Sequence, residues 1–270
     1  MIFNGTQCAA TLAKNLAQDV SLCEKKPVLG VCMVGDNAVS KRYVALKKRT
    51  ADVVGIEVRI SEFPESITTE ELIQELGTLV RDCDGFIVQL PLPAHIDTKA
   101  VLNAIPKEKD VDMLSEEAMD AYYQNTASLL PPVIGVFAEI LSQESIDVAS
   151  KKVVIVGYGR LVGKPAEHWF KKEGADVHVV REGDDIREST IAADIVVLGT
   201  GVPEILTADM VRDGVVILDA GTSEAQGALK GDAHPDVADK ALLFTPVPGG
   251  IGPVTVVMLL KNLVSLCAHV

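Results

Sequence analysis

The chain has 270 residues, 48% of them hydrophobic, and a formal net charge of −13 at pH 7. This length suffices for one large core or two smaller ones, and the alternation of strand and helix patterns favours two. The negative charge opposes the phosphate attraction on which nucleic-acid binders depend, so we expect neither nucleic acid nor an acidic membrane surface as a partner.

In the first half of the chain, strand and helix patterns alternate. Helical periodicity covers residues 6–23, 39–54, 69–80 and 98–105. Apolar runs that predict strands lie at residues 27–35, 56–61 and 86–88. The acidic, irregular stretch 107–132 is expected to lead out of the first domain. We place the boundary near residue 118, which gives domains of residues 1–118 and 119–270.

The second half predicts a doubly wound, mostly parallel sheet. After a linking helix over 134–144, the pattern is a strand over 151–157, a helix over 159–174 and a strand over 175–182. Further strands are predicted over residues 193–201, 214–222 and 242–248. The fold class is therefore α/β, with a Rossmann-type second domain. A last helix over 253–268 is apolar nearly all round, and we expect it to cross back and cover the first domain.

The cysteine pattern and the chain start bear on compartment and cofactors. Five cysteines lack C-x-x-C spacing, and their odd number would leave one unpaired, which favours reduced thiols in the cytoplasm. The first residues show no basic region followed by an apolar run, so we expect no signal peptide, and no stretch reaches the roughly 20 apolar residues of a membrane span. The histidines show no metal-ligand spacing, so we expect no metal.

A glycine-rich loop lies between the predicted strand 151–157 and its helix. Gly157, Gly159 and Gly163 form G-x-G-x-x-x-G at the place where backbone N–H groups and a helix dipole bind a pyrophosphate. The alternative is that these glycines serve helix-to-strand packing. Arg181 and Glu182 follow the next strand, where an arginine favours a 2′-phosphate and an acidic residue a ribose 2′-hydroxyl. Both could also be ordinary exposed charges.

A candidate acid–base group lies in the first domain. Tyr43 and Lys47 share a helix face, and a lysine at a semi-apolar cleft has a pKa lowered toward the range useful for proton transfer. Gln89, predicted at the carboxyl end of its strand, can accept a hydrogen bond from that lysine. The alternatives are a lysine that extends to water and a satisfied core amide. Asp110 and Asp112 could bind donor nitrogens of a heterocycle, or cap helices.

Two stiff segments, residues 88–97 and 245–255, are rich in proline and glycine and suit rigid walls of a cleft, or simply tight turns. With SKRYVALK at 40–47 and KDVD at 109–112, they make the chain resemble the bifunctional methylenetetrahydrofolate dehydrogenase/methenyltetrahydrofolate cyclohydrolase family over nearly its full length. That resemblance implies a homodimer that uses tetrahydrofolate derivatives and NADP or NAD.

The resemblance also implies roles for single residues. The tyrosine stacks on the pterin, the lysine transfers the proton in the cyclohydrolase step, the glutamine tunes that lysine and Asp112 holds the pterin edge. The implied catalytic residues are Lys47, Tyr43, Gln89 and Asp112. The implied substrate-binding residues are Tyr43, Lys47, Val88, Gln89, Leu90, Pro91, Asp112, Pro248, Gly249, Gly250, Ile251, Gly252 and Pro253. The implied cofactor-binding residues are Gly157, Tyr158, Gly159, Arg160, Val162, Gly163, Arg181, Glu182, Gly199, Thr222 and Thr245.

Departures from the family pattern concern the cofactor and the pterin loop. LPPVIG at 130–135 replaces P-C-T-P-x-G, Tyr158 replaces an arginine, and Arg181 with Glu182 replaces histidine and serine. We therefore expect relaxed cofactor specificity or NAD use. Met113 stands where the family has glycine. Alternatives are a dehydrogenase without cyclohydrolase activity and a noncatalytic folate- or nucleotide-binding relative; a shikimate-type dehydrogenase has no need for the stiff segments.

Overall fold

The computed structural model describes residues 1–225 and 228–267, which form two compact units. The three-stranded unit comprises residues 10–132 and the chain from 256 onward; the five-stranded unit comprises residues 1–9 and 133–255. The predicted boundary near residue 118 falls inside helix α5 (Glu116–Tyr123), and the units divide instead between Pro132 and Val133. Helix α5 belongs to the first unit because Asn103 of that unit binds both the backbone and the side chain of Glu116.

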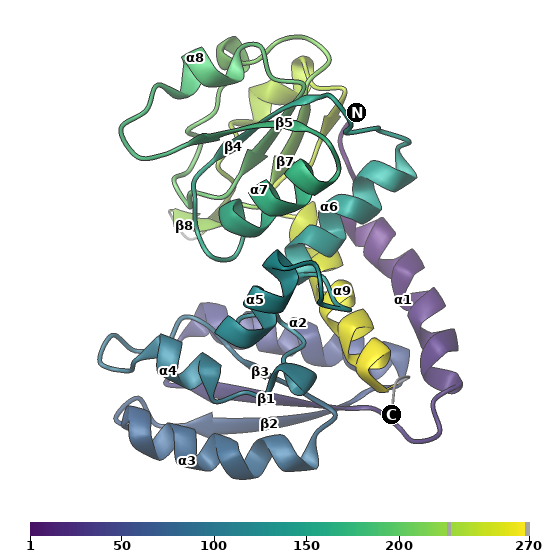
Figure 1. Cartoon of the computed structure of the whole chain (residues 1–270), viewed down its shortest axis with the longest axis vertical. Helices are drawn as coiled ribbons and strands as arrows, with labels where there is room; N and C mark the ends of the chain where they lie inside the picture. Colours follow the sequence, from purple (N-terminus) through teal and green to yellow (C-terminus); the bar gives the residue numbers. More distant parts are fainter. Residues whose placement is uncertain (226–227, 268–270) are drawn as a thin grey trace. The chain divides into compact units, whose positions relative to one another are not determined.

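The sheet of the three-stranded unit is parallel, with the order β2-β1-β3 (Figure 1). Its strands are β1 (Val28–Val34), β2 (Glu57–Phe63) and β3 (Gly85–Val88). Val31 at the centre pairs with Ile60 on one side and with Ile87 on the other. Strand β3 is fully buried, as its continuous apolar run predicts.

Except for α5, the helices of this unit follow the predicted periodicity closely. They are α1 (Gly5–Ser21, whose first residues lie in the other unit), α2 (Ala38–Val54), α3 (Thr69–Leu79), α4 (Thr98–Asn103) and α5, with short 3₁₀ turns η1 (Val80–Asp82) and η2 (Lys107–Lys109). The Asn37 side chain caps α2 by accepting from Val39 and Ser40, and Gly55 ends that helix with φ 89°. Glycine adopts this left-handed conformation without steric cost.

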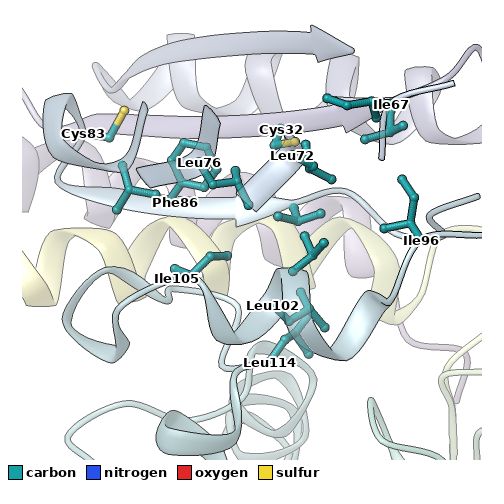
Figure 2. Close-up of a cluster of buried hydrophobic side chains, with 14 residues drawn as sticks. Cys32, Ile67, Leu72, Leu76, Cys83, Phe86, Ile96, Leu102, Ile105 and Leu114 are labelled. Carbon is teal, nitrogen blue, oxygen red and sulfur yellow. The ribbon is translucent and has the colours of Figure 1, made fainter. Parts of the chain in front are cut away.

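A cluster of apolar side chains fills the space between the sheet and helices α3 and α4 (Figure 2). Leu72 and Leu76 of α3 and Phe86 of β3 lie at its centre, each at most 1% exposed. Interior packing of this density fixes β3 against its neighbours, and the residues that follow β3 are fixed with it.

Helix α9 (Ile251–Cys267) ends the described chain, and from Val256 onward it belongs to the three-stranded unit. A side chain at Gly85 of β3 would lie 2.7 Å from Leu263, so α9 packs directly on this strand. Nδ2 of Asn262 donates to the carbonyls of Val111 and Leu130, each over 2.9 Å. The predicted return of the last helix to the first domain is confirmed; its predicted end at Ala268 lies outside the described residues.

The five-stranded unit has a parallel sheet with the order β10-β7-β6-β4-β5. The strands are β4 (Lys152–Val156), β5 (Asp176–Val180), β6 (Ile195–Leu198), β7 (Val216–Asp219) and β10 (Leu243–Phe244). The remaining elements are α6 (Pro132–Gln143), α7 (Gly163–Lys172), α8 (Ile186–Thr190), the antiparallel pair β8 (Ser223–Ala225) and β9 (Ala228–Lys230), and the 3₁₀ turns η3 (Ala208–Met210) and η4 (Pro235–Asp239). The β-α-β order predicts this doubly wound topology correctly.

Some elements differ from their predicted bounds. Helix α7 begins at Gly163, not at residue 159, because Val162 has a non-helical backbone (φ −127°, ψ −67°) and the glycine loop continues to it. Helices α5 and α8 and the β8–β9 pair were not predicted, because three to eight residues are too few for a clear apolar period.

Candidate functional site

Lys47 and Gln89 meet in the three-stranded unit. Nζ of Lys47, from α2, donates to Oε1 of Gln89, directly after β3, over 2.8 Å. The glutamine is itself fixed, because its Nε2 donates to the Leu90 carbonyl over 2.7 Å and its backbone N–H to the Cys32 carbonyl over 2.8 Å. The amine and the carboxamide that sequence spacing singled out are therefore in direct contact.

The surroundings of Lys47 favour its neutral form. Burial lowers the pKa of Lys47, and the negative charge of Asp112 opposes that shift. Burial likewise raises the pKa of Asp112, which Lys47 lowers and Asp110 raises further. Lys47 and Asp112 thus interact in a poorly hydrated place, where the loss of hydration makes the charged form of each group costlier than in water.

Asp110 has a structural role in the loop that carries Asp112. It is 1% exposed, and its Oδ2 accepts from the backbone N–H groups of Leu114 at 2.9 Å and Ser115 at 2.7 Å. Asp110 thus holds the loop directly before α5, whose N-cap residue is Ser115. Met113 in the same loop has φ 57°, a left-handed conformation that favours the glycine of the family pattern.

Tyr43 and the residues after β3 complete the predicted group in this unit. Tyr43 is half-buried one turn before Lys47 on α2. Val88, the residue before Gln89, is buried, whereas Leu90 is half-buried and Pro91 is exposed. The peptide bond between Leu90 and Pro91 is cis. An aromatic face, a lysine and a carboxamide therefore lie on adjoining elements of one sheet edge.

The second stiff segment belongs to the five-stranded unit and forms a tight turn before α9. Gly249 has φ 98°, and the N–H of Gly250 donates to the Pro246 carbonyl over 2.7 Å. A side chain at Gly250 would lie 2.5 Å from that carbonyl oxygen. Ile251 is buried, Pro253 half-buried, and Pro248 and Gly252 exposed.

The glycine loop after β4 has the geometry of a ligand cradle. Gly157 has φ 95°, and a side chain at Gly163 would lie 2.1 Å from the Gly157 carbonyl oxygen. These two glycines are required by the packing of the loop itself. A side chain at Gly159 would meet no described atom within 4 Å, so packing does not explain this glycine. Gly159 is exposed, and the loop lies between the end of β4 and the start of α7, where the sequence predicts a site for a dinucleotide pyrophosphate.

The other predicted cofactor residues differ in accessibility. Val162 packs against Gly199, where a side chain would lie 2.7 Å from the valine Cβ. Arg160 and Thr222 are exposed at the same carboxyl edge of the sheet. Thr245 is fully buried, and its Oγ1 accepts from the Asp219 N–H over 2.7 Å, so its contacts are structural.

Tyr158 of the loop is surrounded by charged side chains. The guanidinium of Arg181 lies 4.8 Å from the centre of its ring, and Nζ of Lys164 lies 5.7 Å from it. Its hydroxyl donates to Glu167 over 2.5 Å. Glu182 is exposed at the same strand end as Arg181. Lys164 and Glu167, which contact the Tyr158 ring and hydroxyl, lie three residues apart on one face of α7.

A Rossmann-type unit with a glycine-rich loop, joined to an α/β unit in which a half-buried lysine contacts a buried carboxamide, defines a two-domain nucleotide-dependent enzyme. The model of the tetrahydrofolate dehydrogenase/cyclohydrolase catalytic domain matches residues 3–112, and that of the NAD(P)-binding domain of the same family matches residues 132–269. The chain belongs to the tetrahydrofolate dehydrogenase/cyclohydrolase family.

Individual relatives match over nearly the whole chain. A bifunctional protein FolD of Mycoplasmopsis synoviae is 37% identical, over 98% of this chain and 99% of its own. The crystal structure of the bifunctional enzyme FolD of Campylobacter jejuni has a TM-score of 0.96 at 31% identity, covering 100% and 99% of the two chains. That of Trypanosoma brucei FolD, complexed with NADP and an inhibitor, has a TM-score of 0.94 at 32% identity, covering 100% and 97%.

Metal-binding clusters and membrane-spanning helices are absent from the described residues, 1–225 and 228–267. No group of three or more His, Cys, Asp or Glu side chains among them could hold a metal ion. None of the helices in the described ranges combines the length and the apolar character that crossing a membrane requires.

Proposed function

We propose that this chain oxidises 5,10-methylenetetrahydrofolate to the 5,10-methenyl form with NAD(P) and hydrolyses the methenyl form to 10-formyltetrahydrofolate. The observation that carries the proposal is the 2.8 Å contact between Lys47 and Gln89 in a member of this family. The hydrolysis needs a group that gives and takes a proton, and burial lowers the pKa of Lys47 toward the range where its amine can do both.

In the hydrolytic step, water adds to the cationic methenyl carbon and must lose a proton. Neutral Lys47 takes this proton at Nζ and can return it to the ring nitrogen as the bond from that nitrogen to the former methenyl carbon breaks. The added hydroxyl then loses its own proton to the freed amine, which passes it to water, and becomes the formyl C=O. Gln89 accepts a hydrogen bond from Nζ and so holds its lone pair toward the substrate. Tyr43 offers an aromatic face for the pterin, and Asp112 accepts hydrogen bonds from donor nitrogens at the pterin edge.

In the oxidative step, a bound nicotinamide dinucleotide supplies the hydride acceptor. Nitrogen lone pairs drive hydride loss from the methylene carbon, so the protein contributes mainly orientation. The backbone of Gly157, Gly159 and Gly163 would hold the pyrophosphate, with the N-terminus of α7 behind it.

We further propose that the enzyme uses both NADP and NAD. Arg181 lies over Tyr158 with its guanidinium in reach of the strand end, where it can donate to a 2′-phosphate. The exposed carboxylate of Glu182 favours a ribose 2′-hydroxyl and repels a phosphate. The two neighbouring residues act in opposite directions, which supports relaxed specificity.

The decisive experiment follows absorbance of methenyltetrahydrofolate, with NAD and NADP in parallel, and then its decay by hydrolysis. Formation and decay support both activities. If methenyltetrahydrofolate forms but the enzyme does not accelerate its decay, the chain is a dehydrogenase without cyclohydrolase activity. If the chain binds folate tightly but catalyses neither step, it is a noncatalytic relative. A kcat/KM for NADP more than about a hundredfold above that for NAD would reject relaxed specificity, since such a ratio is close to 3 kcal/mol.

We also propose a cytoplasmic homodimer. All five cysteines are unpaired thiols in the structure, which supports a reducing compartment. Light scattering coupled to size exclusion tests the assembly, and a monomeric mass at micromolar concentration would reject the dimer.

A further inference from the structure

Two aspartates are fully buried in the five-stranded unit. Asp219 is the last residue of β7, and Asp232 follows β9 by two positions; both are 0% exposed. Buried carboxylates are rare in proteins unless hydrogen bonds or cations compensate their lost hydration. Neither residue takes part in the mechanism proposed above.

Asp219 has donors for both of its oxygens. Oδ1 accepts from the backbone N–H groups of Gly221 at 2.9 Å and Asp232 at 3.3 Å, and Oδ2 accepts from that of Ala233 at 2.9 Å. These bonds tie the segment after β7 to the segment after β9. They stabilise an ionised carboxylate at this position.

Among the described residues, hydrogen-bond donors reach one of the two carboxyl oxygens of Asp232 and not the other. Its Oδ2 accepts from the N–H of Thr200 at 2.6 Å, the hydroxyl of Thr200 at 2.8 Å and the N–H of Gly201 at 3.2 Å. Its Oδ1 is buried and has no hydrogen-bond partner among the described residues. A charged oxygen without a donor is costly in the interior, whereas a protonated oxygen beside an acceptor is satisfied.

The two aspartates are in direct contact, because the backbone N–H of Asp232 donates to Oδ1 of Asp219, and each carboxyl group is packed on a glycine. A side chain at Gly221 would lie 2.0 Å from Cγ of Asp232, and a side chain at Gly231 would lie 2.2 Å from Oδ2 of Asp219. Burial raises the pKa of Asp219 to about 7, and the charge of Asp232 contributes to that rise.

The charged groups on the neighbouring segments are paired elsewhere. Lys230 binds Glu204 over 2.8 Å, and His234 lies 3.0 Å from Asp236. Residues 199–203 and 245–250 contain no ionisable side chain. Within residues 1–225 and 228–267, neither carboxylate has an ion pair with a lysine, arginine or histidine, so a proton is the available compensation.

We propose that Asp219 and Asp232 share one proton, and that this shared proton holds the segments 199–201 and 220–222 in the conformation that binds the dinucleotide. Both are positioning residues. Gly199 and Thr222, two predicted cofactor residues, lie in these segments, so the inference rests on the proposed dinucleotide binding.

The direction of the pH effect follows from the raised pKa of Asp219. Below about pH 7 the pair keeps its proton; above it, two negative charges repel each other in the interior and the Thr200 segment loosens. Dinucleotide affinity therefore falls as the pH rises. The free energy of unfolding contributed by the pair also falls between the ordinary carboxyl pKa and about 7, because the folded state binds the extra proton.

Asp232→Asn is the informative variant. Its amide oxygen can accept the bonds from Thr200 and Gly201, and its NH₂ group can donate to Asp219 as the proposed proton does, without titrating. Asp232→Ala removes both functions. Asp219→Asn is the matched contrast, because an amide NH₂ would face the backbone N–H donors of Gly221 or Ala233.

The test measures the Kd of NADP by calorimetry, and urea unfolding without dinucleotide, at about pH 6 and about pH 8.5. We expect the parent Kd to rise about threefold or more, within the limit of about tenfold per pH unit for one linked proton. Asp232→Asn should show a flat profile near the parent's low-pH affinity, and Asp232→Ala weak binding at both values. Asp219→Asn should be less stable than Asp232→Asn.

Two results would overturn the inference. The first is an equal pH dependence in the parent and Asp232→Asn, and the second is an Asp232→Asn variant as impaired as Asp232→Ala. If the parent binds no dinucleotide at any pH, the proposed function fails instead. The unfolding arm still reports on the shared proton, because the parent should then lose stability with rising pH and Asp232→Asn should not.

Discussion

Nζ of Lys47 and Oε1 of Gln89, 42 positions apart in the chain, are 2.8 Å apart in the structure. The lysine comes from the middle of α2 and the glutamine from the residue directly after β3. Strands β1 and β3 are parallel neighbours in the order β2-β1-β3. The helix that follows β1 therefore begins at the same edge of the sheet at which β3 ends. This contact is the basis of the first two predictions.

Lys47→Ala is expected to lower methenyl hydrolysis by about a hundredfold or more while hydride transfer stays measurable, because general acid–base catalysis contributes about that factor. Separate absorbance assays of the two steps check this. The matched control is Lys48→Ala, since Lys48 is exposed and pairs with Asp52 on the same helix. Hydrolysis rates alike in Lys47→Ala and the parent would reject the role of Lys47.

Substitutions of Gln89 should move the acid limb of the hydrolysis pH profile in opposite directions. Gln89→Glu places a negative charge beside Lys47, raises its pKa and moves the limb to higher pH. Gln89→Leu removes an acceptor that favours the ammonium, lowers that pKa and moves the limb to lower pH. Hydrolysis rates measured from about pH 6 to about pH 9.5 locate the acid limb of each protein, and its pH should increase from Gln89→Leu to the parent to Gln89→Glu. Shifts of the same sign in both variants would contradict it.

Arg181 and Glu182 should affect cofactor preference in opposite ways. Arg181→Ala is expected to lower kcat/KM for NADP by about tenfold with little effect on NAD, since a charge-assisted hydrogen bond is worth about 1.5–3 kcal/mol. Glu182→Ser should raise kcat/KM for NADP relative to NAD. Steady-state kinetics with both dinucleotides measure the ratios. An unchanged NADP:NAD ratio in both variants would show that neither residue contacts the 2′ position.

Substitutions at two glycines of the loop after β4 should separate an effect on packing from an effect on dinucleotide binding. Gly159→Ala should change the free energy of unfolding by less than about 1 kcal/mol, because the new methyl group meets open space. The same variant should bind dinucleotide at least about tenfold more weakly if the pyrophosphate lies against this backbone. Gly163→Ala should instead destabilise the unit, since its methyl group would lie 2.1 Å from the Gly157 carbonyl oxygen. Urea unfolding and calorimetry measure the two effects, and tight binding by Gly159→Ala would count against the cradle.

Asn262 should be important for the attachment of α9 to the three-stranded unit. Asn262→Leu leaves the carbonyls of Val111 and Leu130 without their donor, and we expect a loss of about 2 kcal/mol in the free energy of unfolding. Lys261→Ala, an exposed neighbour on the same helix, is the control and should have little effect. Chemical denaturation compares the two; equal stability of Asn262→Leu and the parent would show that packing by Leu263 suffices.

Some of the site depends on tertiary contacts that no local pattern displays. The spacing of Tyr43 and Lys47 predicted one helix face, and the apolar run before Gln89 predicted a strand end. Arg181 was placed correctly at its strand end, but its position over the Tyr158 ring was not foreseen. The pairing of Asp219 with Asp232 was missed entirely, because neither residue belongs to a recognisable motif and the β8–β9 pair between them was not predicted.

The sequence by itself determined the α/β class, the order of strands and helices, the glycine loop and the family motifs, because periodicity and backbone-restricting residues act over a few neighbours. The tertiary structure alone decided which distant side chains touch and which groups lose their water: the Lys47–Gln89 contact, the lowered pKa of that lysine and the two buried aspartates. The reason is physical, since burial and hydrogen-bond partners are properties of the packed chain and not of any short segment.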